Sequence, residues 1–163
     1  MGELVSLLSV SQTEIEALLD AAFGEDRHRR TAYRLRTDSQ PIASLSFALA
    51  TDNHPIACIQ CWPVAIGDTP LVLVGPVAVH PERQNEGHGS RLMLHMLAAA
   101  ADIGEPPMVM IGDAEYYGRF GFSADLTGGW TMPGPWEAHR LLARNPAGHT
   151  LPVAGMLERA DAL

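Results

Sequence analysis

Apolar residues recur along the chain at the spacings of helices and strands, and residues 91–101 show the clearest helical pattern. Leu92, Met93 and Met96 fall on one side of this helix, so we expect that side to be buried. An apolar strand ending at Val79 and a short polar loop precede the helix. A strand, a glycine-containing loop and a helix in this order place free backbone N–H groups at a positive helix end, which favours phosphate binding.

The first forty residues predict one strand followed by two helices. Residues 2–10 are apolar enough for a short strand, and a capping box from Ser11 to Glu14 opens a helix that is expected to end near Gly24. A second helix is expected from about 26 to 36. It carries five arginines: Arg27, Arg29, Arg30, Arg34 and Arg36. These arginines form either a solvated helix face or a contact with an anionic substrate or the 3′-phosphate of a coenzyme.

The middle of the chain predicts a meander of strands. Three are expected, at residues 42–50, 55–66 and 71–79. Tight turns join them, so they must be antiparallel. Residues 108–111 predict a strand parallel to the one ending at Val79, because a helix crosses between the two. One more strand is expected at 137–144, and the tail from Asn145 shows no clear pattern.

The length and composition of the chain predict one folded domain over residues 1–163. Apolar residues make up 47% of the chain and charged residues 18%, which excludes a disordered protein. No apolar run approaches the roughly 20 residues that a membrane helix needs. The N-terminus lacks the pattern of a signal peptide, so we expect a cytoplasmic protein without a membrane partner.

The charge balance is acidic. Nineteen acidic residues oppose eleven arginines, lysine is absent, and the net charge is −8. Such a balance disfavours nucleic acid as a partner and favours a cationic small molecule.

Cys58 and Cys61 are the only cysteines, and their C-x-x-C spacing invites a zinc or redox interpretation. A zinc site needs a second pair of ligands, and a thioredoxin-type pair belongs at the start of a helix. Both residues lie in an expected strand, where side chains three residues apart point to opposite faces. We therefore expect two reduced, structural thiols.

Residues 84–89 carry the first functional motif, Gln84-Asn85-Glu86-Gly87-His88-Gly89. The dinucleotide-binding fingerprint needs three glycines directly after a strand, and the P-loop needs a lysine, so neither pattern fits. The segment resembles the acyl-CoA-binding motif of the GNAT acetyltransferase superfamily. Glycine there lets a pyrophosphate approach the main chain where a Cβ would collide. An ordinary strand–turn–helix connection is the alternative.

Residues 112–122 carry the second motif, which follows a strand and ends in Gly-Phe. The segment resembles the second GNAT motif through Ala114, Tyr116, Tyr117, Gly121 and Phe122. Its Gly-Asp-x-x-Tyr-Tyr-x-Arg-Phe-Gly-Phe pattern resembles that of a small bacterial subgroup. A helix held in the core by aromatic residues is the alternative interpretation.

The resemblance covers residues 40–123 and implies an α/β fold of the GNAT type. This fold is a mixed, mostly antiparallel sheet with helices on both faces, splayed after the strand ending at Val79 to admit coenzyme A. The implied co-substrate is acetyl-CoA, and no metal is implied. Backbone groups of these residues are expected to bind the coenzyme: Val77, Val79, Gln84, Asn85, Gly87, His88, Gly89 and Ser90.

The family position of Tyr117 implies a general acid that protonates the departing thiolate. A tyrosine suits this role, because its unperturbed pKa of about 10 keeps it protonated at neutral pH. The general base stays open among His80, Glu82, Asp113 and an ordered water.

Two functional classes follow, with acetyl transfer to a small amine or an N-terminus favoured. The other class is an acyl-CoA-binding sensor or partner module without turnover. A Rossmann-type nucleotide-binding domain is disfavoured by the antiparallel meander before the loop. A homodimer is one option for assembly. The acidic composition favours a small cationic acceptor, whereas the arginines of residues 27–36 would select an amine with a carboxylate if they overhang the same groove.

Overall fold

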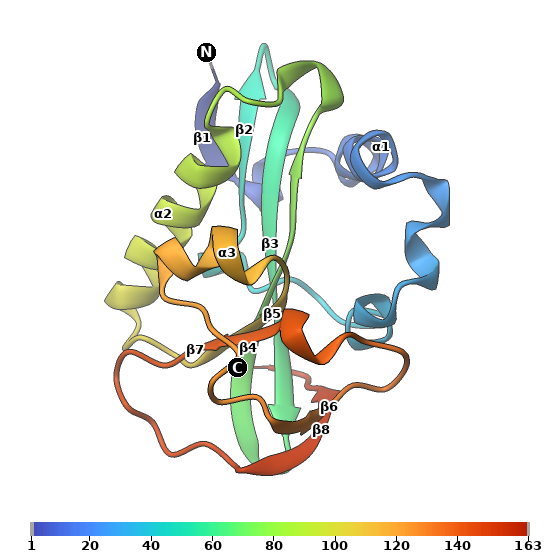
Figure 1. Ribbon diagram of the computed structural model, residues 1–163. Helices are drawn as coiled ribbons and strands as arrows, with labels where there is room; N and C mark the ends of the chain where they lie inside the picture. The colour runs from blue at the N-terminus through green and yellow to red at the C-terminus, as the bar shows by residue number, and fades with distance from the viewer. Residues whose placement is uncertain (1, 163) are drawn as a thin grey trace.

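The computed structural model describes residues 2–162 and shows one sheet with helices on both faces (Figure 1). Met1 and Leu163, which belong to the single domain predicted from the sequence, lie outside the described residues. The strand order is β1-β2-β3-β4-β5-β7, and β8 extends the sheet beside β3. The strands are β1 (Glu3–Ser6), β2 (Phe47–Thr51), β3 (His54–Ile66), β4 (Thr69–Val79), β5 (Met108–Ile111), β6 (Gly129–Thr131), β7 (Leu141–Arg144) and β8 (Ala154–Arg159).

Helices cover the two faces of the sheet separately. The α-helices are α1 (Gln12–Phe23), α2 (His88–Asp102) and α3 (Ala114–Tyr117). The 3-10 helices are η1 (Leu7–Ser9), η2 (Glu25–Arg29), η3 (Thr31–Leu35), η4 (Ala43–Leu45), η5 (Pro81–Arg83), η6 (Gly118–Phe120) and η7 (Ala138–Arg140). In Figure 1, α1 and α2 lie on opposite sides of β3 and β4. Among residues 2–162, no helix combines the length and apolar character needed to cross a bilayer.

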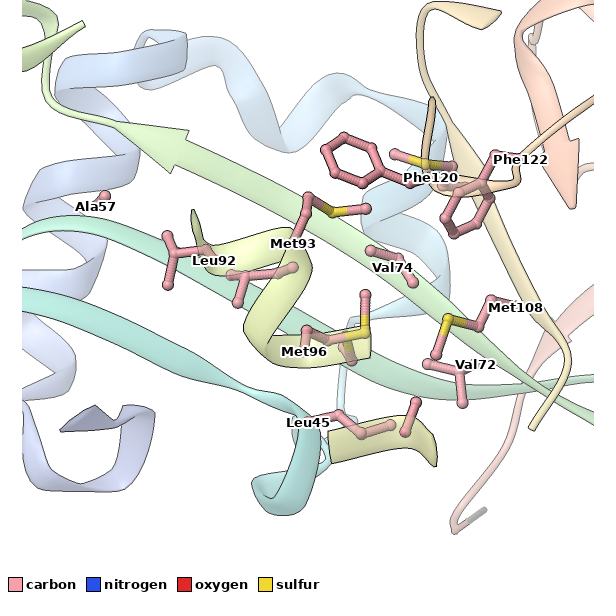
Figure 2. Packing of buried hydrophobic residues seen from close by; sticks show 14 of the residues in the cluster. Leu45, Ala57, Val72, Val74, Leu92, Met93, Met96, Met108, Phe120 and Phe122 are labelled. Atoms are coloured by element: carbon pink, nitrogen blue, oxygen red, sulfur yellow. The ribbon is translucent and has the colours of Figure 1, made fainter. Parts of the chain in front are cut away.

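The buried side of α2 forms the larger core, as its sequence pattern predicts. Figure 2 shows Met93 and Met96 directed toward Val74 of β4 and Phe122 after η6. Leu92, Met93 and Met96 are fully buried, and each such side chain stabilises the fold by about 1.5–3 kcal/mol. This packing fixes α2, and with it the loop at its N-terminus, against β4.

The three central strands form the predicted antiparallel meander. β4 and β5 are parallel, also as predicted, but they pair only through Val72 with Met108 and Leu73 with Val109. From Val74 onward, β4 has no partner on its β5 side among residues 2–162. The sheet is therefore splayed along the second half of β4, which agrees with the sequence prediction.

A β-bulge in β4 lies at the point where the splay begins. Ile59 pairs with Val77 and Cys61 with Val74, so β4 has one extra residue at this point. Gly75 adopts φ 126°, a backbone conformation that favours glycine. The indole N–H of Trp62 donates a hydrogen bond of 2.8 Å to the Gly75 carbonyl. Because a bulge bends its strand and increases the local twist, this one directs β4 away from β5.

The helix predicted over residues 26–36 is wrong as a continuous element. The segment forms η2 and η3, which are separated at Arg30, where the backbone is extended. Tertiary contacts replace helical continuity, because the buried Arg27 side chain forms ion pairs with Glu16 and Asp20 of α1. The local arginine-rich pattern contained no signal for these contacts.

Three other boundaries differ from the sequence prediction. The first strand is limited to residues 3–6, because η1 follows. The second strand begins at Phe47, after η4, where the Ser46 hydroxyl accepts a hydrogen bond of 3.0 Å from the Cys61 N–H. The strand predicted at 137–144 is β7 alone, preceded by η7.

β6 and β8 were not expected from the sequence. β8 pairs antiparallel with the end of β3 and parallel with β6. Only Leu157 of β8 is buried, so its sequence lacks the alternating pattern of a half-buried strand. Its pairing depends on partners far away in the sequence.

Cys58 and Cys61 point to opposite faces of the sheet, as predicted. Cys58 packs against the α1 side, and Cys61 packs in the core beneath α2. Both thiols are free and fully buried. Burial raises the pKa of Cys58 to about 12 and also raises the pKa of Cys61.

We expect neither thiol to react with a disulfide reagent such as DTNB in the folded protein at neutral pH. Burial blocks access, and a raised pKa removes the reactive thiolate. Both should react rapidly after denaturation in guanidinium. Stoichiometric labelling of the native protein within minutes, at unchanged circular dichroism, would contradict the described packing.

Candidate active site

The loop between β4 and α2 has the geometry of an anion-binding site. His80 caps η5, accepting a hydrogen bond of 3.1 Å at Nδ1 from the Glu82 N–H. Asn85 and Gly87 both have positive φ, at 65° and 83°, and α2 begins at His88. These two left-handed residues turn the chain so that successive N–H groups face the same concave side.

Free backbone donors are concentrated in this loop. None of the seven N–H groups from Gln84 to Ser90 donates a well-formed hydrogen bond within residues 2–162. No side chain caps the start of α2 in the described chain. The positive end of a 15-residue helix and seven free donors together favour a negatively charged group such as a phosphate.

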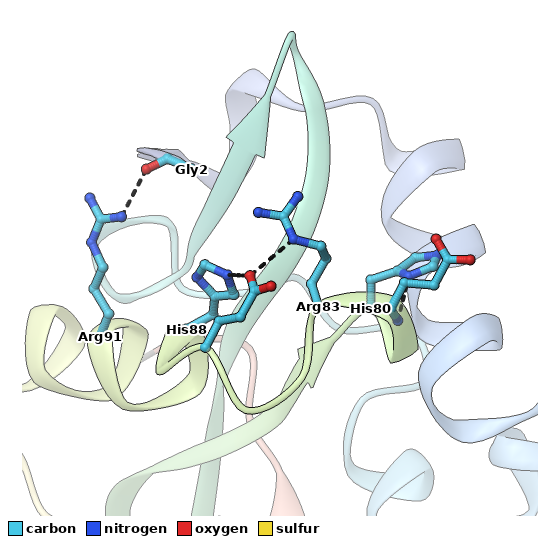
Figure 3. A network of polar contacts seen from close by, with 7 residues as sticks. Gly2, His80, Arg83, His88 and Arg91 are labelled. Atoms are coloured by element: carbon cyan, nitrogen blue, oxygen red, sulfur yellow. Dashed lines mark hydrogen bonds and ion pairs between the residues drawn. The ribbon is translucent and has the colours of Figure 1, made fainter.

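Side chains hold the loop from outside (Figure 3). The Glu86 carboxylate lies 2.7 Å from Nε2 of the buried His88 and 3.0 Å from Nε of Arg83. Its contacts with His88 and then Arg83 lower the pKa of Glu86. Arg91 donates a hydrogen bond of 2.8 Å to the Gly2 carbonyl, which ties α2 to the N-terminal segment.

The two glycines of the loop have different environments. A Cβ at Gly87 would meet no atom within 4 Å, so the space above this residue is open to a ligand. A Cβ at Gly89 would lie 3.9 Å from the side chains of Val77 and Val79. Gly87 therefore fits the role predicted for both, whereas Gly89 faces β4 at a distance where a Cβ would make ordinary contact.

Val77 and Val79 present backbone groups at the open edge of β4. The His80 N–H donates a hydrogen bond of 2.8 Å to Ile56 of β3. Backbone N–H and C=O groups alternate in direction along a strand, so those of Val77 and Val79 point away from β3. This side of β4 has no strand partner among the described residues. An extended ligand with amide groups could pair there as a strand does.

A cavity of about 830 Å³ lies where β4 and β5 diverge. Val74 to Val77 of β4 and Met110 to Asp113 at the end of β5 line one part of it. Tyr117 of α3, the arginine-rich segment before β2 and the loop before β7 line the rest. The residues of the loop before α2, 84–90, are not part of this lining.

Tyr117 is the only member of the tyrosine pair among the residues that line this cavity. Its ring packs on Gly112, where a Cβ would lie only 2.7 Å from two ring carbons. Its hydroxyl makes no hydrogen bond within residues 2–162, and burial raises its pKa. Tyr116 stacks edge-on against Tyr117 and Phe120 in the core. Tyr117 thus lines the cavity, and its raised pKa keeps the hydroxyl protonated at neutral pH.

Of the three candidate bases, only Asp113 lines the cavity. It is also the N-cap of α3, because its carboxylate accepts a hydrogen bond of 3.0 Å from the Glu115 N–H. His80 holds η5, and neither His80 nor Glu82 lines the cavity. Within the described chain, no group of three His, Cys, Asp or Glu side chains is close enough to bind a metal.

The arginines that line the cavity are the site residues whose positions the sequence predicted least well. Five line the cavity: Arg27, Arg29, Arg30, Arg36 and Arg140. The acidic balance of the whole chain therefore does not extend to this cavity, because only Asp113 and Glu137 supply carboxylates to its lining. Arg140 and Glu137 were missed as site residues, since the loop before β7 meets the site only through the tertiary fold.

Similar proteins share this architecture. The sequence profile described as Acetyltransferase (GNAT) domain matches residues 43–124, which include both sequence motifs. An Escherichia coli K12 protein described as uncharacterized N-acetyltransferase YhbS is 30% identical over 138 residues, covering 78% of this chain and 80% of YhbS.

Solved structures agree. A structure of GNAT family N-acetyltransferase YhbS from Escherichia coli in complex with CoA has a TM-score of 0.77, with 20% identity over 98% of this chain and 89% of that one. A GNAT family acetyltransferase from Brucella melitensis in complex with acetyl-CoA has a TM-score of 0.66, with 26% identity over 98% and 96%. The predicted GNAT fold is confirmed, while the subgroup suggested by residues 112–122 stays a prediction.

We expect Gly112→Ala to destabilise the protein by about 1–3 kcal/mol, because the new methyl group collides with the Tyr117 ring. In a Tyr117→Ala background the same substitution should cost much less, and urea unfolding of the four proteins measures this coupling. Gly118→Ala is the matched control, since its Cβ meets no atom within 4 Å. Equal costs in both backgrounds would show that Gly112 does not position the tyrosine.

Proposed function

Because the chain belongs to the GNAT acetyltransferase domain family, we propose that it transfers an acetyl group from acetyl-CoA to a primary amine. The proposal rests on the position of Tyr117, which lines the cavity formed where β4 leaves β5 and whose pKa is raised by burial. Complexes of similar GNAT proteins with CoA and acetyl-CoA support this choice of co-substrate.

The loop of residues 84–90 and the open edge of β4 bind different parts of the co-substrate. The free N–H groups of residues 84–90 hold the pyrophosphate at the start of α2, with open space above Gly87. The amide groups of the pantetheine arm pair with Val77 and Val79 along the unpaired edge. This path directs the arm from the loop toward the cavity beside Tyr117.

Acetyl-CoA supplies a thioester whose carbonyl carbon accepts the unprotonated amine. A backbone N–H at the open edge of β4 stabilises the negative charge that develops on the carbonyl oxygen. Tyr117 donates its proton to the departing sulfur, and the raised pKa keeps this proton in place at neutral pH. Asp113 lines the same cavity and takes the amine proton directly or through a water.

We expect Gly87→Ala to weaken acetyl-CoA binding at least about ten-fold, because the methyl group enters the space that the pyrophosphate needs. Gly148→Ala is a matched control, since Gly148 also has positive φ and open surroundings but lies far along the chain from the loop. Both variants should lose a similar stability of about 1 kcal/mol. Calorimetry that finds equal acetyl-CoA affinities would remove the loop from the binding site.

We expect Tyr117→Phe to lower kcat by about 10²–10⁴, with little change in acetyl-CoA affinity, because only the proton donor is lost. Tyr116→Phe should have a mild effect, since Tyr116 does not line the cavity. CoA release with a panel of amines measures both variants. The alkaline decline of kcat that reports the tyrosine proton should disappear in Tyr117→Phe.

The same assay separates an enzyme from an acyl-CoA sensor. Wild-type protein that binds acetyl-CoA yet releases no CoA with any amine would contradict transfer and favour the sensor. Equal and small losses of kcat in the two tyrosine variants would show that Tyr117 is not the general acid. The proposal of acetyl transfer would still stand.

A further inference from the structure

The cavity beside Tyr117 is lined by more arginines than there are carboxylates to pair with them. Arg27 is paired with Glu16 and Asp20 and is buried. Four other arginines of the lining have no carboxylate within 4.0 Å among residues 2–162: Arg29, Arg30, Arg36 and Arg140. Two carboxylates face them, and Glu137 already lies 3.5 Å from Nε2 of His139. The cavity is basic although the chain as a whole carries a net charge of −8.

Among these four arginines, Arg36 has a buried donor atom without a hydrogen-bond partner in residues 2–162. Its guanidinium carbon lies 4.3 Å from the centre of the Tyr33 ring, and its buried Nε has no hydrogen-bond acceptor within residues 2–162. Burial lowers the pKa of Arg36 to about 10, so the side chain is still charged at neutral pH. A buried donor without a partner is costly, and an anionic ligand would relieve that cost.

Contacts on several sides hold the arginine-rich segment in place. The Thr31 hydroxyl and Arg34 donate hydrogen bonds to carbonyls of the loop before β7, at Pro135 and Pro133. A Cβ at Gly134 would lie 2.9 Å from the Thr31 hydroxyl, so glycine permits this close contact. Arg159 of β8 donates a hydrogen bond of 2.9 Å to the Thr37 carbonyl. The segment is therefore a fixed wall of the cavity.

Arg140 places positive charge close to the reacting centre. It follows the loop that contacts the arginine-rich segment, and its charge acts to lower the pKa of Tyr117 against the larger effect of burial. Its carbonyl accepts a hydrogen bond of 2.9 Å from the Gly112 N–H, which fixes its backbone beside the tyrosine. An acceptor that reaches this centre thus meets Arg140 on one side and Arg36 on the wall.

We propose that the acceptor is a small primary amine that bears a carboxylate, and that Arg36, assisted by Arg140, binds this carboxylate. The inference rests on the proposed function, whose acceptor site it specifies. Guanidinium groups pair with carboxylates through two parallel hydrogen bonds, so they fix orientation as well as charge. The uncharged amine can then face the thioester while its carboxylate stays on the arginine wall.

Matched pairs of amines test the proposal with the acetyl-CoA-saturated full chain. The standard amino acids, β-alanine and γ-aminobutyrate are each compared with their carboxamides, and spermidine and 2-aminoethylphosphonate are added. The best amino acid should exceed its carboxamide at least about ten-fold in kcat/KM, mainly through KM. High salt should reduce the difference. A preference for the carboxamide or spermidine overturns the proposal, and a preference for the phosphonate over β-alanine overturns the assignment to a carboxylate.

Variants of single arginines test which residue binds the carboxylate of the acceptor. Arg36→Gln should remove most of the preference for the carboxylate, because kcat/KM falls much further on the amino acid than on its carboxamide, and Arg36→Lys should retain part of the preference. Arg159→Gln is the matched control, because it removes one charge and one contact of the same segment outside the cavity. Equal losses on both amines, or weaker binding of acetyl-CoA in Arg36→Gln, would overturn the role of Arg36.

Binding of the products separates failure of this inference from failure of the proposed function. The CoA complex is titrated with N-acetylglycine and N-acetyl-L-glutamate and with their carboxamides, which requires no turnover. Tighter binding of the carboxylates, lost in Arg36→Gln, supports the site even if no amine is acetylated. Equal binding of carboxylates and carboxamides overturns the inference even if acetyl transfer is observed.

Discussion

The separation of β4 from β5 is the constraint on which the rest of the site depends. Two residue pairs join these parallel strands, and the bulge at Gly75 then directs β4 away. Trp62 fixes the bulge through its hydrogen bond to the Gly75 carbonyl. A regular strand would continue its pairing with β5 toward Ile111 and close the cavity, whereas the splayed β4 carries the backbone groups of Val77 and Val79 along an open edge. The fold leaves these groups unpaired, and a ligand with amide groups can replace the missing strand.

The larger core makes this open arrangement stable. Met93 and Met96 pack beneath α2, so the helix stays against β4 where the strand has lost its other neighbour. The start of α2 is held in turn by the contacts of Glu86 and Arg91. The loop therefore presents its N–H groups in one fixed arrangement, which lowers the cost of ordering them around an anion.

Local patterns predicted the parts of the fold that depend on nearby residues. The buried face of α2, the antiparallel meander and the glycine loop of residues 84–89 follow from spacing and from residue types that are neighbours in sequence. The helix expected over residues 26–36 failed because Arg27 is drawn into contacts with α1. β8 was missed because its pairing with β3 joins residues about a hundred positions apart, with little alternation in its own sequence.

The candidate site shows the same division. Tyr117 and Gly87 were identified because each belongs to a short motif, whereas Arg140 was missed because only the tertiary fold brings it to the cavity. The net charge of the chain was a poor guide to the groove. Exposed charges are screened beyond about 10 Å at ordinary ionic strength, so the four unpaired arginines of the lining determine the local field. The hypothesis of an arginine-lined acceptor site was available from the sequence, but its position was not.

A crystal structure of the protein with bound acetyl-CoA would test whether the separation of β4 from β5 forms the coenzyme site. We predict that the pyrophosphate lies on the N–H groups of residues 84–90, that the pantetheine amides pair with Val77 and Val79, and that the thioester sulfur lies within hydrogen-bond reach of the Tyr117 hydroxyl. A coenzyme bound elsewhere, or one whose sulfur lies away from Tyr117 with β4 and β5 closed along their length, would contradict it.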